Sequence, residues 1–292
     1  MKNIILYAYS KTDIYGEFTL NFFLQNGLKE SPEYDIFFII SGSVDVSTIK
    51  KLPSYVKLIT RTNIGYDFGA WSDIILNIDI SKYKYFLFLN NSVVGPCIPR
   101  YLKHIYWPEL FYSHINDNIK LVGCTTNHDI KKHIQSYCFC VDSIGLDILI
   151  KGGIFVKNLD KDKNDIIYEH EIMMLSYINQ AGYDGYTFET LRNLDDINYI
   201  KNGNLSDGNY FKVNCNHDLN PYEILFIKPR LNCFNDAFLF YLKTLGLKFC
   251  NEESDVSNEN DELVDINKNK IIKNQVVSIK NVMNEKNKKV FK

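Results

Sequence analysis

The sequence predicts an α/β protein whose mostly parallel sheet is covered by helices on both faces. Short apolar runs of strand length alternate, through residues 1–250, with longer segments whose apolar residues recur at helical spacing. The stretch Tyr55–Pro99 shows this best, because the runs Val56–Thr60 and Tyr85–Leu89 enclose the amphipathic segment Asp67–Asn77. A strand, a glycine turn, a helix and a second strand form a βαβ unit, from which Rossmann-like sheets are built.

The other elements follow from the same two patterns. A first buried strand is predicted at Asn3–Tyr9, followed by a helix at Ile14–Gly27 that stops at its glycine. A helix at Asp142–Ile150 begins at an aspartate cap, and an amphipathic helix at Asn164–Gln180 ends before Gly182. Further strands are predicted at Asp35–Ile40, Ile119–Cys124, Ser136–Val141 and Glu223–Lys228, and a last helix at Asn235–Leu247.

Composition bounds the domain organisation and the class of partner. The 292 residues suffice for one large α/β domain, which we place at residues 1–250. Residues 251–292 form a polar tail, either disordered or folded as a short docking helix. The net charge of −2 gives no basic footprint for nucleic acid. No apolar run is long enough to form a transmembrane segment, so we expect a cytoplasmic protein, with peripheral attachment to a membrane left open.

The seven cysteines are odd in number and lie mostly within apolar runs. Only Cys138 and Cys140 approach the paired spacing of a zinc site. In an extended strand their side chains would share one face, with Phe139 on the other. We therefore expect buried, reduced thiols.

Polar or glycine residues stand at both junctions of the βαβ unit. Asn63, Gly65 and Asp67 precede its helix, and an Asn90-Asn91-Ser92 turn follows its second strand. Ligands of open α/β sheets bind beyond the carboxyl ends of the strands, so both clusters should face one crevice. The glycine spacing matches neither the dinucleotide fingerprint nor the phosphate loop of ATPases. The alternative is that Gly65 and Asp67 only form a turn and a helix cap.

Two segments of this unit resemble those of nucleotide-sugar-dependent glycosyltransferases of the GT-A fold. They are NIGYDFGAW at residues 63–71 and YFLFLNNSVVGP at residues 85–96, and they are most similar to rhamnan synthesis F-type proteins and their microbial and viral relatives. The resemblance spans residues 1–247. It implies that the first segment lies against the nucleotide. It also implies that the second takes the place of the Asp-x-Asp element, which usually binds a divalent metal and the sugar-diphosphate.

The chain departs from that element, because Asn90, Asn91 and Ser92 stand where aspartates are expected. Amides and hydroxyls are poor substitutes for carboxylates as ligands of Mg²⁺ or Mn²⁺. One alternative is weak binding of Mn²⁺ or Mg²⁺, for which Asn90, Ser92 and His217 are the candidate ligands. The other is a diphosphate held by backbone N–H groups and cationic side chains.

Three further segments fit the same resemblance on the donor side. The segment HIQS at residues 133–136 presents His133 and Gln135 on one face of a strand entrance, where both can bind sugar hydroxyls or a phosphate. The segment PYEILFIKPR at residues 221–230 places Lys228 and Arg230 at the end of a predicted strand, where cations can hold a diphosphate. We also assign Tyr7, in the first strand, to the donor site.

The segment from Glu171 to Ser176, followed by Gly182, resembles the helix that carries the catalytic base in inverting family 2 glycosyltransferases. The resemblance places that base at Glu171. Helical spacing agrees, because Glu171 shares the apolar stripe of Ile167, Met174 and Ile178, whereas Glu169 does not. The alternative is that Glu171 caps the helix or pairs with a lysine.

These observations predict an enzyme that transfers a sugar, such as the deoxysugar L-rhamnose, from a nucleotide-sugar to a glycan hydroxyl with inversion. UDP- or dTDP-sugars are the favoured donors. The main alternative is a non-catalytic member of the fold that binds a nucleotide-sugar or a glycan. The missing aspartates favour this alternative, and the helix carrying Glu171 opposes it. A cysteine- or histidine-dependent hydrolase is a second alternative, but no nucleophile motif such as G-x-S-x-G supports it.

Overall fold

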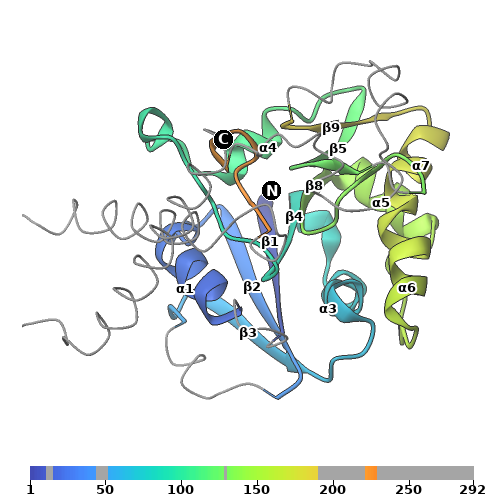
Figure 1. Cartoon of the computed structure of the whole chain (residues 1–292), viewed down its shortest axis with the longest axis horizontal. Coiled ribbons are helices and arrows are strands. Elements are labelled where there is room, and N and C mark those ends of the chain that lie inside the picture. The colour runs from blue at the N-terminus through green and yellow to red at the C-terminus, as the bar shows by residue number, and fades with distance from the viewer. Residues whose placement is uncertain (11–15, 44–51, 128–129, 190–220, 229–292) are drawn as a thin grey trace, which may run out of the picture. The chain divides into compact units, whose positions relative to one another are not determined.

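The computed structural model describes residues 1–10, 16–43, 52–127, 130–189 and 221–228. Seven strands form one sheet in the order β3–β2–β1–β4–β8–β5–β9 (Figure 1). The first four run parallel, β8 is antiparallel to both of its neighbours, and β9 is parallel to β5. The predicted α/β fold with a mostly parallel sheet is therefore confirmed.

The strands are β1 (Lys2–Ser10), β2 (Tyr34–Ser41), β3 (Val56–Arg61), β4 (Tyr83–Asn90), β5 (Ile119–Gly123), β6 (Thr126–Asn127), β7 (His133–Ile134), β8 (Cys138–Asp142) and β9 (Asp184–Thr187). Among the described residues, the short strands β6 and β7 pair only with each other, in antiparallel fashion. The α-helices are α1 (Gly16–Asn26), α3 (Tyr66–Ile75), α4 (Pro108–Tyr112), α5 (Ser143–Lys151), α6 (Lys163–Ile166), α7 (Met173–Gln180) and α10 (Pro221–Ile224). Two 3₁₀ turns are η1 (Ile80–Lys82) and η2 (Arg100–Leu102), and η3 (Ile167–Glu171) is a π-helical turn between α6 and α7.

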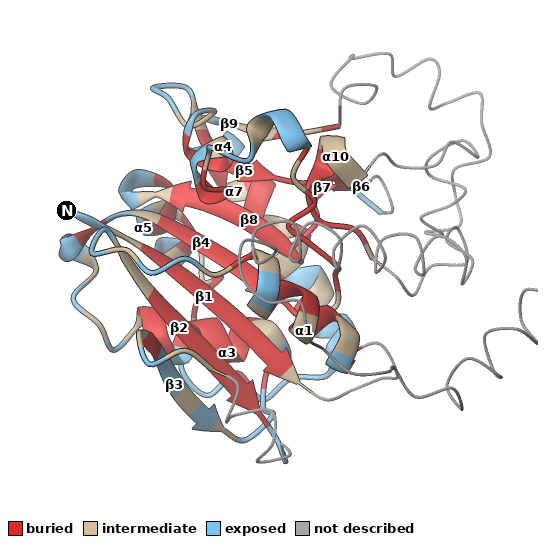
Figure 2. Cartoon of the chain, turned by 90° about the vertical axis from the view of Figure 1, so that its left-hand side faces the viewer, coloured by how far each residue is buried: buried red, intermediate tan, exposed pale blue. Residues whose placement is uncertain are grey.

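Helices cover both faces of the sheet, and alternate residues of each strand supply the two cores. Along β1, Ile5, Tyr7 and Tyr9 pack with α1, α4 and α10, whereas Ile4 and Leu6 pack with α3, α5 and α7. Both faces of β1 are buried, as Figure 2 shows by colour. This burial accounts for the nearly continuous apolar runs in the sequence.

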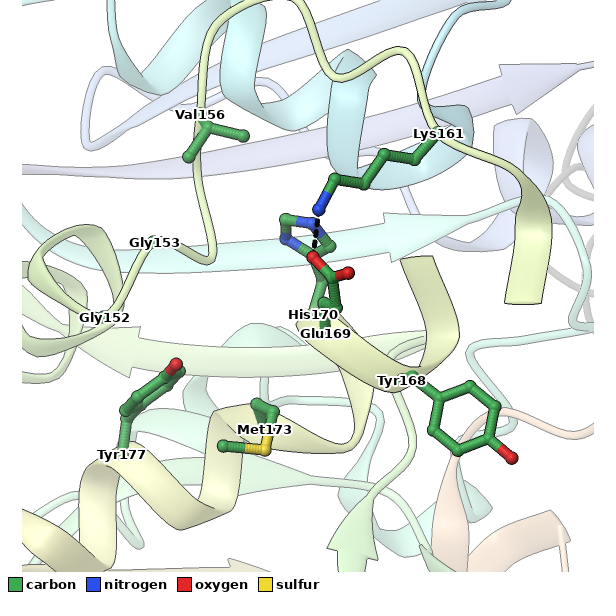
Figure 3. Close-up of a pocket in the computed structure, with 9 residues that line it drawn as sticks. All are labelled: Gly152, Gly153, Val156, Lys161, Tyr168, Glu169, His170, Met173 and Tyr177. Carbon is green, nitrogen blue, oxygen red and sulfur yellow. Dashed lines mark hydrogen bonds and ion pairs between the residues drawn. The ribbon is translucent and has the colours of Figure 1, made fainter. Parts of the chain in front are cut away.

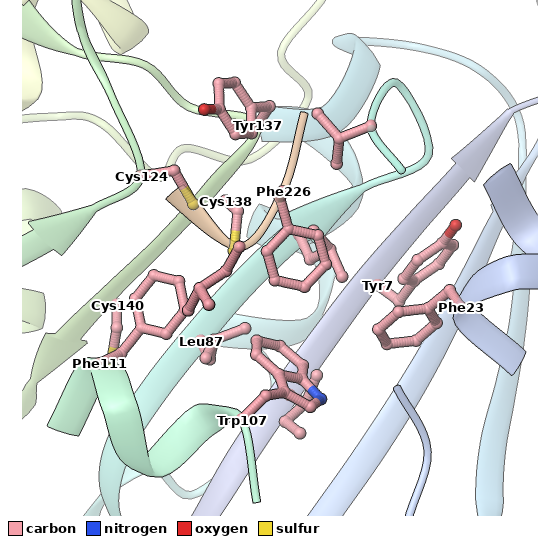
Figure 4. Packing of buried hydrophobic residues seen from close by; sticks show 14 of the residues in the cluster. Tyr7, Phe23, Leu87, Trp107, Phe111, Cys124, Tyr137, Cys138, Cys140 and Phe226 are labelled. Carbon is pink, nitrogen blue, oxygen red and sulfur yellow. The ribbon is translucent and has the colours of Figure 1, made fainter. Parts of the chain in front are cut away.

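The first core also holds the cysteines that the structure describes. Cys97, Cys124, Cys138 and Cys140 are buried free thiols; Cys124 and Cys138 lie near Phe226, and Cys140 lies beside Phe111 (Figure 4). Phe139 packs into the opposite core. The prediction that Cys138 and Cys140 share one face is confirmed.

Some sequence predictions need correction. Residues Glu223–Lys228 do not form a strand, because α10 occupies Pro221–Ile224 and only Ile227 makes a bridge, to Val94. Proline suits the first turn of a helix, and a short apolar run does not by itself distinguish strand from buried helix. Strand β9 and helix α4 were not predicted. The predicted helix at 235–247 and the tail at 251–292 lie outside the described residues.

Asp35 shows how the amino-terminal edge of the sheet is held together. Its carboxylate accepts hydrogen bonds from Tyr83 (2.7 Å) and Lys2 (3.0 Å) and pairs with Lys57 (3.1 Å). Burial opposes ionisation of Asp35, but these three partners outweigh it and hold its pKa below the usual value.

We therefore expect Asp35→Asn to lower the free energy of unfolding by about 1 kcal/mol at pH 7. A lowered folded-state pKa stabilises the fold above the unfolded-state pKa, and this contribution disappears as pH falls through the folded-state value. The difference from wild type should thus shrink in acid. Urea unfolding at pH 7 and pH 3 measures it. Asp147→Asn, which breaks an exposed ion pair on α5, is the matched control and should change little. An equal loss in both variants would contradict the prediction.

Candidate active site

The carboxyl-terminal edge of the sheet brings together residues that lie far apart in the sequence. Asp67, at the start of α3, accepts a 2.6 Å hydrogen bond from the Nδ2 group of Asn90, at the end of β4. The charges of Glu171 and Lys228 both act on the Asp67 carboxyl group. Glu171 and Lys228 thus lie close enough to Asp67, at this edge of the sheet, to affect its ionisation.

The turn before α3 is held in place by Arg61. Its guanidinium donates to Asp73 (2.6 Å), to the Ile64 carbonyl (2.7 Å) and to Ser41 (3.3 Å). Gly65 has a left-handed φ of 73°, and a Cβ atom there would lie 2.6 Å from the Leu159 carbonyl oxygen, so only glycine fits. The turn fixes Asp67 at the helix start and leaves the predicted donor-site residue Asn63 exposed.

The Asn90-Asn91-Ser92 turn is internally hydrogen-bonded. The Oδ1 atom of Asn90 accepts from both the N–H group (3.0 Å) and the hydroxyl (2.6 Å) of Ser92. The amide of Asn91 bonds to the main chain of Ser10 through its oxygen (3.1 Å) and its nitrogen (2.8 Å). Asn91 thus ties the end of β4 to the end of β1.

These engaged oxygens do not fit a divalent metal site at Asn90 and Ser92. Hard cations need several oxygen ligands, preferably carboxylates, with lone pairs to offer. Among the described residues, no group of three or more His, Cys, Asp or Glu side chains could hold a metal ion. His217, the third candidate ligand, lies outside the described residues, as does Arg230.

Glu171 reaches the crevice because of the π-helical turn η3. The N–H group of Ile172 bonds to the carbonyl of Ile167 (3.0 Å), five residues back, and this extra residue changes which side chains face the core. His170 is buried, with 2% exposure, whereas Glu171 is half-buried. Glu171 therefore does not occupy the buried stripe predicted from regular helical spacing. Instead, its Oε1 atom accepts from the N–H group of Ser136 (3.2 Å).

Buried polar side chains form the wall beside Glu171. Thr125 donates its hydroxyl hydrogen to Oε1 of Gln135 (2.8 Å), so the Tyr137 hydroxyl, 2.7 Å away, must donate to Thr125. The ammonium group of Lys228 lies over the Tyr137 ring, 5.3 Å from its centre. His133 is also buried, and its Nδ1 atom contacts the Lys131 carbonyl at 2.7 Å. Gln135 and Lys228 are therefore linked through Thr125 and Tyr137.

Tyr7 and Glu189 are two buried polar residues near this edge. Tyr7 stacks between Phe23 and Phe38, and its hydroxyl has no hydrogen-bond partner in the part of the chain that the structure describes. Burial raises the pKa of Tyr7 well above its usual value, with smaller contributions from Tyr9 and Asp67. Glu189 follows β9, and its carboxylate accepts from the Thr126 N–H group (2.6 Å). Sequence reasoning missed Glu189 because it missed β9, whose end would have pointed to the same edge.

Asp67 is the carboxyl group of this site whose ionisation is altered. Burial and, to a smaller extent, the charge of Glu171 raise its pKa from 3.8 to about 6, against the opposing hydrogen bond from Asn90 and the charges of Lys228 and Lys163. Asp67 therefore exchanges its proton near neutral pH, which is common for carboxyl groups in functional clefts.

This raised pKa predicts a pH-dependent effect of Asp67→Asn on stability. The folded protein holds the Asp67 proton between pH 4 and pH 6, whereas the unfolded chain releases it, so this group's contribution to stability falls as pH rises through that range. Asparagine cannot ionise, so the variant lacks this loss of stability with rising pH. Its free energy of unfolding, relative to that of wild type, should therefore increase by up to roughly 2 kcal/mol between pH 4 and pH 7. Urea unfolding at both pH values tests this, and a constant difference would contradict it.

Residues 36–210 match the family model described as rhamnan synthesis protein F, and this match covers more than half of the chain. The chain belongs to the rhamnan synthesis protein F family. The family predicted from the segments at 63–71 and 85–96 is thus confirmed. No curated protein matches the chain in sequence. None of the helices in the described ranges of this family member is long and apolar enough to cross a membrane.

Solved structures similar to this chain include enzymes that act on nucleotides and sugars. The mannosyltransferase PcManGT from Pyrobaculum calidifontis, in complex with GDP-Man and Mn²⁺, matches with a TM-score of 0.42 and 9% identity, over 64% of this chain and 54% of that chain. A cytidylyltransferase from Leptospira borgpetersenii matches with a TM-score of 0.38 and 13% identity, over 64% and 76% of the two chains. The glycosyltransferase GlyE of Streptococcus pneumoniae TIGR4 matches with a TM-score of 0.41 and 11% identity, over 90% and 67%. This chain thus spans about half of the mannosyltransferase.

Proposed function

We propose that this member of the rhamnan synthesis protein F family is a glycosyltransferase that moves a sugar from a nucleotide-sugar to a glycan hydroxyl, with inversion. The observation that carries the proposal is that a second carboxyl group, Glu171, and a cation, Lys228, act electrostatically on Asp67 at the carboxyl edge of the sheet. Family membership supports polysaccharide synthesis as the setting. The compartment that we propose is the cytoplasm.

Glu171 serves as the base in this proposal. The acceptor hydroxyl gives its proton to the Glu171 carboxylate, and its oxygen attacks the anomeric carbon from the face opposite the leaving group. The bond from that carbon to the diphosphate breaks, and the diphosphate takes the electron pair. The Ser136 N–H group holds one carboxylate oxygen of Glu171, which leaves the other for the acceptor.

Lys228 stabilises the negative charge that develops on the departing diphosphate. This role suits a site in which the Oδ1 atom of Asn90 already accepts two hydrogen bonds from Ser92. Asp67 orients the Asn90 amide, and the turn before Asp67 places Asn63 and Gly65 beside the nucleotide. His133, Gln135 and Tyr7 complete the donor side, and no step in this scheme passes through a metal ion.

The donor is a UDP- or dTDP-sugar, with a deoxysugar such as L-rhamnose favoured by family membership. A thermal-shift panel of nucleotides and nucleotide-sugars, with and without Mn²⁺ or Mg²⁺, tests this assignment. A ligand that binds only the folded state raises the melting temperature by an amount that grows with its concentration. We expect UDP or dTDP compounds to stabilise the protein. If no nucleotide does so, the donor-site assignment is wrong.

A non-catalytic protein that binds nucleotide-sugars is the second candidate, and the engaged amides of Asn90 and Asn91 favour it. Release of nucleotide from the stabilising donor, measured with and without Mn²⁺, separates the two functions. Turnover supports the enzyme. Binding without release of nucleotide from any donor, in the presence of glycan acceptors, would establish the second candidate instead.

A further inference from the structure

A cavity of about 410 Å³ lies beside η3, lined in part by its residues Tyr168, Glu169 and His170. Its volume lies in the range of small-molecule sites, roughly 300–1,000 Å³. Figure 3 shows it between the segment from Gly152 to Lys161 and the helical residues from Tyr168 to Tyr177. The residues assigned above to the donor and the base do not line it. The lining residues are Gly152, Gly153, Val156, Lys161, Tyr168, Glu169, His170, Met173 and Tyr177.

The buried imidazole of His170 is one wall of this cavity. Its Nδ1 atom lies 2.8 Å from the Ile154 carbonyl, and its Nε2 atom has no partner among the residues that the structure describes. Burial lowers the pKa of His170, so the ring is neutral at pH 7. A neutral ring that donates from Nδ1 leaves Nε2 as a bare acceptor. A buried acceptor without a donor costs free energy. Nε2 is closed to solvent in this structure, so a ligand hydroxyl supplies that donor only when the side chains around the cavity adjust.

The other walls combine an aromatic ring with a neutralised charge pair. The Tyr177 ring packs directly against Gly152, where any Cβ atom would lie 2.7 Å from it, and it stays partly exposed. Lys161 and Glu169 form a hydrogen-bonded ion pair, drawn as a dashed line in Figure 3. A Cβ atom on Gly153 would meet nothing, so this side of the cavity is open to a ligand.

From these walls we infer that the cavity is a binding site for a neutral sugar ring. A pyranose offers an apolar face of C–H groups for Tyr177 and hydroxyls that both donate and accept. Its hydroxyls meet Glu169 and Lys161 and, once the surrounding side chains adjust, Nε2 of His170. A phosphate is disfavoured because Glu169 already neutralises Lys161. The inference rests on the proposed function in one respect: the ring is taken to be a distal unit of the acceptor glycan, bound behind the helix that carries Glu171.

Met173 supplies a reporter for the test, because its methyl group belongs to a cavity residue and the chain has only four methionines. The full chain, labelled with ¹³C at the methionine methyls, is titrated with L-rhamnose, D-glucose, D-galactose, D-mannose, N-acetylglucosamine and their methyl glycosides. We expect at least one of them to shift the Met173 signal in a saturable way. If none does, or if nucleotides shift it and sugars do not, the inference is wrong.

Two variants and a control complete the experiment. Tyr177→Leu and Glu169→Gln should each lower the affinity for the sugar about five-fold or more, the loss expected from one contact of roughly 1 kcal/mol. Glu169 is exposed, so its variant tests the site without disturbing the core. Tyr101→Leu removes a ring of 77% exposure outside the cavity and should change nothing. Unchanged affinity in both cavity variants would overturn the inference. Nucleotide binding, followed separately by thermal shift, reports on the proposed function alone.

Discussion

Glu171→Gln should lower the turnover number for sugar transfer by about 10²–10⁴-fold, the usual contribution of a general base. The glutamine keeps the size of the side chain and can still accept the Ser136 N–H hydrogen bond, but it cannot take a proton from the acceptor. Donor binding should change little, because the loss falls on the chemical step. Steady-state kinetics with the donor found in the thermal-shift panel measures both quantities.

Asp165→Asn is the matched control for Glu171→Gln. Asp165 is an exposed carboxylate in the same helical region, two residues before the π-helical turn begins. Its loss should leave turnover within about two-fold of wild type, since surface substitutions of this kind cost little. A Glu171→Gln enzyme with full activity would remove Glu171 from the mechanism. A loss confined to donor affinity would instead place it at the nucleotide.

The edge at which the site lies could be predicted from the sequence because it depends on strand order and direction. The runs Val56–Thr60 and Tyr85–Leu89, with an amphipathic helix between them, require a right-handed parallel unit, and parallel strands end at one edge. That rule alone brought Asp67 and Asn90 together, and they share a 2.6 Å hydrogen bond. The long-range pairing of Asn91 with Ser10 was not visible, because side-chain partners depend on tertiary contacts that no local pattern encodes.

The orientation of Glu171 could not be predicted, because the argument from spacing assumed a regular helix. A single π-helical turn rotates the following side chains, so His170 enters the core and Glu171 faces Ser136. Nothing in the sequence from Ile167 to Glu171 marks that turn. The correction has a functional consequence, since the same turn separates the proposed base from the cavity that His170 lines.

The sequence placed Lys228 at the site by predicting that it ends a strand. In the structure this segment is instead a short helix followed by a single bridge. Ile227 exchanges hydrogen bonds with Val94 (2.8 and 2.9 Å), and this pairing carries Lys228 to the end of β4. Gly95 permits the approach, because a Cβ atom there would lie 2.4 Å from the Phe226 ring. The cation therefore reaches the crevice through contacts of the backbone and not through a strand of the main sheet.

Lys228→Met should lower kcat/KM for the nucleotide-sugar by about 10²–10³-fold, the cost of removing one preorganised donor to developing negative charge. Methionine keeps the apolar stem that packs near Tyr137 and removes only the charge. Binding of the nucleoside diphosphate should weaken by about 10–100-fold, while binding of the uncharged nucleoside should not change, because Lys228 acts on phosphate oxygens. Kinetics and thermal shift with both ligands measure these effects.

Lys84→Met is the matched control for Lys228→Met. Its ammonium group also lies over a tyrosine ring, 4.7 Å from the centre of Tyr85, but Lys84 is exposed near the start of β4, at the opposite edge of the sheet. Wild-type kinetics in Lys84→Met and a large loss in Lys228→Met would assign the effect to position and not to net charge. Equal losses would refute the role of Lys228. If Mn²⁺ restored activity to Lys228→Met, the diphosphate charge would be met by a metal after all, and the cationic scheme would be wrong.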